Sequence, residues 1–332
     1  MSRPGSRRRG EVPGGGSPTL LAIGNFDGVH RGHVEVLSGA GREATTIGVM
    51  PIALTFDPPP AVVLGNKTPA ALTPLERKIE LIEAAAPGMR VVVKTFDLTI
   101  AESSPERFAR EVLVGELGAV RVIVGRNFRF GKGRSGDLTT LAALGDDLGF
   151  SARAMEIVGD EKGAWSSTRV RRAIAAGDWE DVEAVLGRPH ALSGVVVRGD
   201  QRGRTIGFPT ANVGDVTEVM PPNGVYAVLV DRLDGSGDRR ALARGVANVG
   251  VRPTVGGGLS TEVHLLDFQP STNADRDLYG ARLRLHLVAF LREERKFDGL
   301  DALKAQIARD ADAARARLAP KKPIPGPFGG WY

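Results

Sequence analysis

The first half of the chain alternates short apolar runs with amphipathic segments. Apolar runs at 20–23, 47–56, 90–93 and 119–124 predict buried strands. Helix starts fall between them. Thr73 is the expected N-cap, Pro74 the first helical residue and Glu76 the third residue after the cap. Ser104 and Pro105 open a second helix. Strands separated by helices predict an α/β module, a parallel sheet covered on both faces.

After Arg188 and Pro189 the pattern changes to short strands with turn residues between them. The expected strands are 192–197, 207–213, 225–230, 243–249, 261–266 and 281–290. In the last of these, leucines alternate with polar residues, which is the period of a half-buried strand. The one long helical segment is 301–318. The pattern predicts an all-β small barrel with a C-terminal helix.

These changes divide the chain into four parts. Residues 1–18 are rich in Gly, Pro, Ser and Arg, so we expect a disordered basic tail. The α/β module should span 19–187 and the barrel 188–318. The Pro- and Gly-rich segment 319–332 should be a loose tail.

Composition narrows the cellular setting and the partners. The chain has no cysteine, which excludes disulfides and Cys-bound zinc and favours a cytoplasmic location. No apolar run is long enough to cross a membrane. The net charge is +5, and the four arginines of the tail supply most of it against Glu11. We therefore expect neither a nucleic-acid nor a membrane partner.

The first candidate site is the segment 24–33 (GNFDGVHRGH), which follows the first strand and leads into a helix. Glycines there let the backbone approach a polyphosphate, and the helix N-terminus offers free N–H groups. His30 and His33 can donate to phosphate oxygens as charge develops. ATP-binding candidates in this segment are Gly24, Phe26 and Asp27. The alternatives are two surface histidines or part of a zinc site.

Two further segments carry phosphate-binding chemistry. In 166–171 (SSTRVR), Ser167 and Thr168 can cap a helix or bind ATP phosphates, and Arg171 can grip a departing pyrophosphate. The alternative is a plain capped helix with a basic face. The segment 125–131 (GRNFRFG) follows a strand, where ligands of open α/β sheets bind.

Together with 55–58 (TFDP), these strings resemble the nucleotidylyltransferase superfamily, and in particular the FMN adenylyltransferase module of bacterial FAD synthetase. The resemblance implies a Rossmann-like parallel sheet, with His30, His33 and Arg171 on the ATP phosphates. It implies that Phe56, Asn127 and Phe130 line the flavin pocket. The implied reaction is direct attack of the FMN phosphate on the ATP α-phosphate. Pro59 departs from the family, which frequently has His there.

The barrel contains no G-x-x-x-x-G-K-[ST] string, which excludes a Walker-type kinase at the level of motifs. Its candidate segment is instead 199–212, where Gly199, Gly203 and Gly207 precede a strand. Thr210 and Asn212 are two residues apart and so share a strand face. Their neutral oxygens suit Mg²⁺ bound with ATP phosphates. Gly203 and Thr210 are the ATP-binding candidates.

A carboxylate on a later strand is the candidate base. Glu262 and His264 share one face, while Val263 points the other way. A carboxylate aimed at a pocket can take the proton of an attacking hydroxyl. The alternative is a solvated Glu on a polar barrel surface.

With 222–226 (PNGVY), 278–280 (LYG) and Leu291–Arg292, these segments resemble the riboflavin kinase module. The resemblance implies metal at Thr210 and Asn212, a catalytic base at Glu262 and a flavin contact at Arg292. The segment 269–276 is longer than the family's usual turn and should be a surface insertion.

The module order matches the bifunctional bacterial FAD synthetase. It implies ATP-dependent phosphorylation of riboflavin to FMN, then adenylyl transfer to give FAD and pyrophosphate, with Mg²⁺ as cofactor. The partners would be ATP, riboflavin and FMN. Two alternatives remain: an enzyme with one active module, and a flavin-sensing or nucleic-acid-binding regulator.

Overall fold

The computed structural model describes residues 17–199, 207–233, 239–251, 259–269, 277–324 and 330–332, apart from the side chains of Val251 and Leu259. Its contacts divide the chain into two compact units. The first runs to Pro69 and continues over Thr73–Ser166, and the second comprises Ala70–Leu72 and Ser167–Tyr332. None of the helices in the described ranges is long and apolar enough to cross a membrane.

The first unit is built on a five-stranded sheet. All its strand pairs are parallel and their order is β3-β2-β1-β4-β5. The strands are β1 (Thr19–Ile23), β2 (Met50–Asp57), β3 (Arg90–Thr95), β4 (Ala119–Val124) and β5 (Ser151–Ala154). This order reverses between β1 and β4, where α/β folds of this kind bind nucleotides. The predicted Rossmann-like parallel sheet is confirmed.

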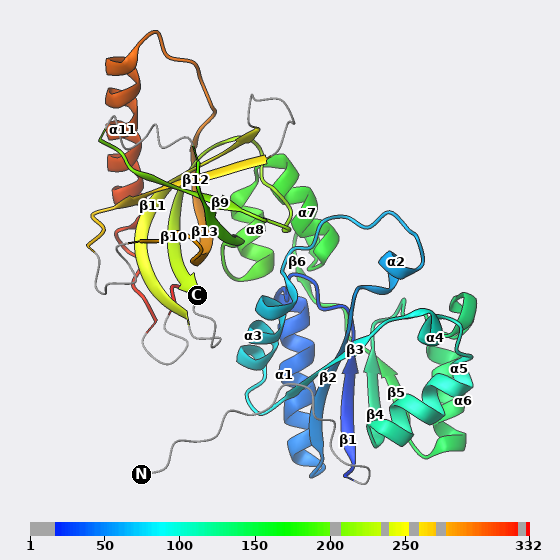
Figure 1. Cartoon of the computed structure of the whole chain (residues 1–332). Coiled ribbons are helices and arrows are strands. Elements are labelled where there is room, and N and C mark those ends of the chain that lie inside the picture. The colour runs from blue at the N-terminus through cyan, green and yellow to red at the C-terminus, as the bar shows by residue number, and fades with distance from the viewer. Residues whose placement is uncertain (1–16, 200–206, 234–238, 252–258, 270–276, 325–329) are drawn as a thin grey trace. The chain divides into compact units, whose positions relative to one another are not determined.

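Helices cover both faces of this sheet (Figure 1). They are α1 (Arg31–Thr46), α2 (Pro60–Val63), α3 (Leu75–Ala85), α4 (Leu98–Ala101), α5 (Pro105–Arg107), the π-helix η1 (Phe108–Glu116), the 3₁₀ turn η2 (Lys132–Arg134) and α6 (Leu138–Leu148). A short hairpin, β6 (Gly159–Asp160) and β7 (Gly163–Ala164), precedes the end of the unit.

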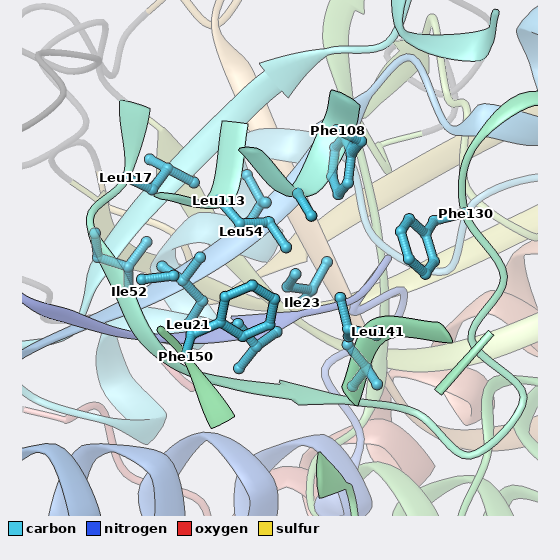
Figure 2. Close-up of a cluster of buried hydrophobic side chains, with 14 of the residues drawn as sticks. Leu21, Ile23, Ile52, Leu54, Phe108, Leu113, Leu117, Phe130, Leu141 and Phe150 are labelled. Carbon is cyan, nitrogen blue, oxygen red and sulfur yellow. The ribbon is translucent and has the colours of Figure 1, made fainter. Parts of the chain in front are cut away.

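The sequence of β1 explains why both faces of the sheet are covered. Leu21 and Ile23 point to one face and join a cluster with Leu113 of η1 and Leu141 of α6 (Figure 2). Leu20 and Ala22 point to the other face, where α1 and α3 pack. All five residues of the strand are buried, as expected for a central parallel strand.

One expected helix start differs from the structure. Ser104 caps its helix as predicted, since its hydroxyl accepts from the Arg107 N–H at 3.1 Å. Thr73 does not cap α3, because the helix begins one residue later than expected and Pro74 holds the cap position. The Thr73 hydroxyl instead accepts from the Gly28 N–H at 3.2 Å, which ties it to the loop after β1.

The second unit is a closed six-stranded antiparallel barrel, as predicted. Its order is β10-β11-β12-β9-β8-β13. The strands are β8 (His190–Val197), β9 (Thr210–Gly214), β10 (Gly224–Leu233), β11 (Arg239–Val251), β12 (Leu259–Leu266) and β13 (Arg282–Arg292). The helices are α7 (Ser167–Ala176), α8 (Trp179–Leu186) and the C-terminal α11 (Leu300–Leu318), which packs against β10, β11 and β13.

Two features of this unit differ from the expected division of the chain. Helices α7 and α8 group with the barrel, whereas we expected 19–187 to form one module. The end of the expected loose tail is also packed: Trp331 is 7% exposed and belongs to a cluster with Leu229 and Leu318. Counting Pro and Gly missed this contact because composition does not show that a single indole is buried. Residues 1–16 of the expected basic tail and 270–276 of the expected insertion lie outside the described ranges.

Candidate active sites

His30 and His33 meet at the start of α1, directly after β1. The helix begins at Arg31, with His30 as its cap residue. The His30 Nδ1 accepts from the His33 N–H at 3.3 Å. The two rings stack with centroids 3.7 Å apart. The two histidines therefore lie at the helix N-terminus, where the sequence placed them.

The turn that presents this pair has an unusual backbone. Phe26 and Val29 have φ of 46° and 35°, in the left-handed region that few side chains adopt. The Phe26 ring is 1% exposed, lies in the core and meets His33 edge-on at 5.3 Å. The expected contact of Phe26 with ATP stays a prediction, and its buried ring packs against His33. Strained turns of this kind cluster at functional sites.

Asp27 and Gly28 link this loop to the start of α3. The Asp27 Oδ1 accepts from the Thr73 N–H at 3.3 Å, and the Gly28 N–H is bound by the Thr73 hydroxyl. Both groups were expected near the ATP phosphates, and these bonds show that they also fix the loop. Gly24 has a steric role as well, because an added Cβ would lie 3.1 Å from the Phe26 ring.

Sequence reasoning missed Lys78, on the first turns of α3. Its side chain is 7% exposed, and burial lowers its pKa while the carboxylates of Asp27 and Asp57 act in the opposite direction. A cation near the carboxyl ends of β1 and β2 is available to phosphates there. The signal was the Glu-Arg-Lys run that follows Pro74.

The expected flavin residues of this unit lie at the ends of β2 and β4. Phe56 and Phe130 belong to the same buried cluster and are 8% and 7% exposed. Asn127 is exposed, in a turn where the Phe128 N–H donates to the Gly125 carbonyl. Asn127 is therefore exposed at this edge of the sheet, whereas the two rings are mostly buried, and their flavin contacts stay predictions.

Ser167, Thr168 and Arg171 open α7, in the second unit. Thr168 is exposed and Ser167 half-buried. The Arg171 guanidinium donates to the carbonyls of Ser167 and Ala70, at 3.4 and 3.2 Å. The neighbouring Arg169 forms a buried pair with Asp181, with contacts of 2.6 and 3.1 Å, which fastens α7 to α8.

The candidate kinase residues form a row around the barrel. Glu262 of β12 lies opposite Asn212 of β9 on one side and Asn248 of β11 on the other. The row continues through Val225 of β10 to Arg292 of β13. Directly paired residues project from the same face. Val263 belongs to the barrel core, so Glu262 lies on the outer face, as the alternation predicted.

A cavity of about 350 Å³ lies along this row. Its walls come from β9 to β13, from α11 and from the segment between β13 and α11. They are formed by Phe208, Thr210, Val225, Val246, Asn248, Glu262, His264, Arg292, Glu294, Arg295, Phe297, Leu303, Ile307 and Asp310. Three predicted residues, Thr210, Glu262 and Arg292, therefore share one cavity.

Asn212 is not among the residues that line this cavity, and it is 7% exposed. Its amide packs against Gly199, where an added Cβ would come within 2.3 Å of the Asn212 Nδ2. This close approach explains why position 199 is a glycine. Gly203, the other expected ATP-binding residue of this segment, lies outside the described residues.

Arg292 is fixed by the C-terminal helix. Its Nε and Nη2 donate to the Asp310 carboxylate at 3.0 and 2.8 Å, and Asp310 also accepts from Gln306 at 2.7 Å. The Arg292 guanidinium lies 5.7 Å from the centre of the Phe297 ring. A preordered cation beside an aromatic ring suits a planar, electron-rich ligand.

Asn248 and Glu294 are polar residues of the cavity that the sequence did not predict. Asn248 donates from Nδ2 to the Glu294 Oε1 at 2.8 Å. Its Oδ1 is buried without a hydrogen-bond partner. The available signal was that Asn248 lies opposite Glu262, but strand register cannot be read from one sequence. Among the described residues, no three His, Asp or Glu side chains group as a metal site.

Comparison with known proteins identifies the family. Residues 15–169 match the family model described as FAD synthetase, and residues 186–318 match the riboflavin kinase model. A bifunctional riboflavin kinase/FMN adenylyltransferase from Escherichia coli (strain K12) is 40% identical over 306 residues, covering 92% of this chain and 94% of that protein. The chain belongs to the bifunctional riboflavin kinase/FMN adenylyltransferase family.

A second relative has the same name, and a solved structure with a different name has a similar fold. The Bacillus subtilis (strain 168) protein of the same name is 37% identical, covering 89% of this chain and 91% of its own length. A solved structure from Streptococcus pneumoniae, named a macrolide-efflux protein, matches with a TM-score of 0.76 at 27% identity, over 92% of this chain and 96% of that one.

The family assignment gives the chain two activities. It phosphorylates riboflavin to FMN and adenylylates FMN to FAD, with ATP as the donor in both reactions. The predicted family, fold class and pair of transferase activities are confirmed. The alternative of a non-enzymatic flavin-sensing or nucleic-acid-binding regulator is not supported.

Proposed function

We propose that Glu262 is the general base of the kinase reaction in the barrel cavity. It would take the proton of the riboflavin 5′-hydroxyl as that oxygen attacks the ATP γ-phosphate. The observation that carries the proposal is that Glu262 lies in one row with Asn212 and Arg292, on the outer barrel face. Arg292 and Phe297 would hold the flavin ring in the same cavity.

A divalent cation fits the neighbouring strand β9. Thr210 lines the cavity and Asn212 lies opposite Glu262, so two neutral oxygens are offered beside the base. Mg²⁺ commonly takes one or two protein ligands together with phosphate oxygens and waters. Mg²⁺ would neutralise charge on the transferring phosphate. We therefore assign the cofactor Mg²⁺ to Thr210 and Asn212, and the ATP phosphates to the same strand.

In the first unit we place adenylyl transfer at the carboxyl ends of β1 and β4. His30 and His33 would donate to the ATP α-phosphate while the FMN phosphate attacks it directly. Gly24 and Asp27 would shape the phosphate loop, and Asn127 would bind the flavin side. The stacked, capped arrangement of the two histidines supports this assignment.

Arg171 would bind the departing pyrophosphate, with Ser167 and Thr168 donating to the same phosphates. This role requires the guanidinium to exchange the carbonyls of Ser167 and Ala70 for phosphate oxygens. A charged phosphate is the stronger acceptor, which favours the exchange. The partners would be small molecules, in the cytoplasm, without a nucleic acid or a membrane.

The test is to convert Glu262 to Gln in the full chain. With riboflavin, ATP and Mg²⁺, chromatography should show FMN formation reduced by roughly 10²- to 10⁴-fold. FMN supplied from outside should still become FAD, which is the internal control for folding. Near-normal phosphorylation would remove Glu262 from the reaction.

A further inference from the structure

Asn248, the residue beside the proposed base, has a polar atom that no residue in the described ranges binds. Asn248 is the register partner of Glu262 on β11 and lines the same cavity. Partners in neighbouring antiparallel strands have Cβ atoms roughly 5 Å apart. A group bound at Glu262 is therefore within reach of the Asn248 carboxamide.

The orientation of this carboxamide is fixed by Glu294. A carboxylate only accepts hydrogen bonds, so the bond of 2.8 Å to the Glu294 Oε1 must come from the amide nitrogen. The Asn248 Oδ1 must then face away from Glu294. Gly250 makes this contact possible, because an added Cβ would lie 2.6 Å from the same Oε1 atom.

The Asn248 Oδ1 atom is buried and accepts no hydrogen bond. A buried acceptor without a donor costs about 1–3 kcal/mol, and such groups occur where a ligand completes them. Riboflavin carries further hydroxyl groups at C2′, C3′ and C4′ of the chain that ends at the phosphorylated 5′ position. These hydroxyls are donors of the correct kind, and they accompany the reacting oxygen to Glu262.

We propose that the Asn248 Oδ1 accepts a hydrogen bond from one of the secondary ribityl hydroxyls of riboflavin, with Glu294 holding the amide in place. Asn248 is then a specificity-determining residue for the polyhydroxyl chain. The proposal rests on the placement of riboflavin beside Glu262. A site that merely holds a flavin ring does not need such an acceptor.

The test pairs a substitution with altered substrates. Asn248→Leu keeps the side-chain volume and removes both polar atoms. Kinase kcat/KM is measured with riboflavin and with its 2′-, 3′- and 4′-deoxy analogues. The wild type should lose roughly 5- to 100-fold with the analogue that lacks the partner hydroxyl. Asn248→Leu should lose a similar factor with riboflavin and should no longer distinguish that analogue.

Two further variants separate positioning from packing. Glu294→Gln retains an acceptor for the Asn248 amide and should keep the preference, whereas Glu294→Ala should weaken it. Val246→Ala removes volume from the cavity wall on the same strand face and should leave the preference unchanged. Adenylylation of supplied FMN reports that each variant is folded.

The proposal is overturned if Asn248→Leu keeps the full wild-type preference at all three hydroxyl positions, or if only its KM for ATP changes. Neither outcome would bear on Glu262, whose assignment stands or falls with the Glu262→Gln measurement.

Discussion

Trp179 of α8 packs edge-on against Tyr226 of β10, with ring centroids 5.4 Å apart and an interplanar angle of 81°. Tyr226 is fully buried in the barrel core, so α8 contributes to that core. Arg188, which follows α8, is also in a buried environment. Burial, with repulsion from Arg284 as a smaller cause, lowers the pKa of Arg188 to about 10.

This contact predicts where the kinase can be separated from the rest of the chain. A fragment of residues 167–332 should fold and convert riboflavin to FMN without making FAD. A fragment of residues 188–332 keeps Thr210, Asn212, Glu262 and Arg292 but loses Trp179. We expect it to make FMN with a stability lower by about 3 kcal/mol, measured by urea unfolding.

Trp179→Ala in the 167–332 fragment is the matched control, and it should reproduce most of that loss. Equal stability of the two fragments would place the domain boundary at 187/188 after all. The matching N-terminal fragment, 17–187, should make FAD from FMN. The shorter fragment 17–166 should not, because it lacks Ser167, Thr168 and Arg171.

A second prediction concerns the end of the chain. Asp231 and His286 form a fully buried pair at 2.9 Å, and the Asp231 Oδ1 also accepts from the Trp331 N–H at 3.0 Å. The Trp331 indole donates to the Val230 carbonyl at 3.1 Å. Trp331→Ala should therefore lower barrel stability by about 3 kcal/mol in thermal or urea unfolding. Ile324→Ala, at a side chain 52% exposed, should change it by less than about 0.5 kcal/mol.

Much of the fold followed from periodicity, and the exceptions have physical causes. The alternation of Leu283, Leu285 and Leu287 was sufficient to place β13, because one face of that strand is buried. The affiliation of α8 could not be predicted in the same way. An amphipathic helix shows that one face is buried, but its sequence does not say which neighbour covers it.

The residues of the candidate sites also differ in how far the sequence could predict them. Residues proposed to act through their own chemistry, such as His30, His33 and Glu262, could be named from motif spacing, and their roles stay predictions. Residues whose position depends on a partner were missed: Asn248 depends on strand register, and Lys78 on the burial of α3 against Asp27. Phe26 was assigned to ATP from its place in the 24–33 segment; its φ is positive and its ring is buried, which the sequence alone did not indicate.

The third prediction tests the metal site through its glycine neighbour. Gly199→Ala would bring a methyl group to 2.3 Å from the Asn212 Nδ2, so the amide must move. The Mg²⁺ concentration needed for half-maximal FMN formation should rise, and Asn212→Ala should raise it further. FAD formation from supplied FMN should not change.

Gly299→Ala is the control for this series, because its added Cβ meets nothing within 4 Å in the same unit. Lower thermal stability of Asn212→Ala with an unchanged Mg²⁺ titration would show that Asn212 only packs the barrel.

The last prediction separates the roles of the two histidines. His33→Ala removes one donor to the phosphate but leaves the cap of α1 intact. The full chain should then convert riboflavin to FMN normally and stop there, with FAD formation reduced by roughly 10²- to 10³-fold. His30 has a second task, because its Nδ1 caps the helix by accepting from the His33 N–H. His30→Asn supplies a good capping side chain without the imidazole, whereas His30→Ala removes both.

If His30 contributes to chemistry, His30→Asn should keep the thermal stability of the wild type and still lose FAD formation. If it only caps α1, His30→Asn should form FAD at close to the wild-type rate, and His30→Ala should be both less stable, by about 1 kcal/mol, and slower. The rings stack at 3.7 Å, so removing His30 also frees His33 to rotate. A His30→Asn,His33→Ala double variant accounts for this coupling: losses that do not add show that the pair acts as one unit on the phosphate.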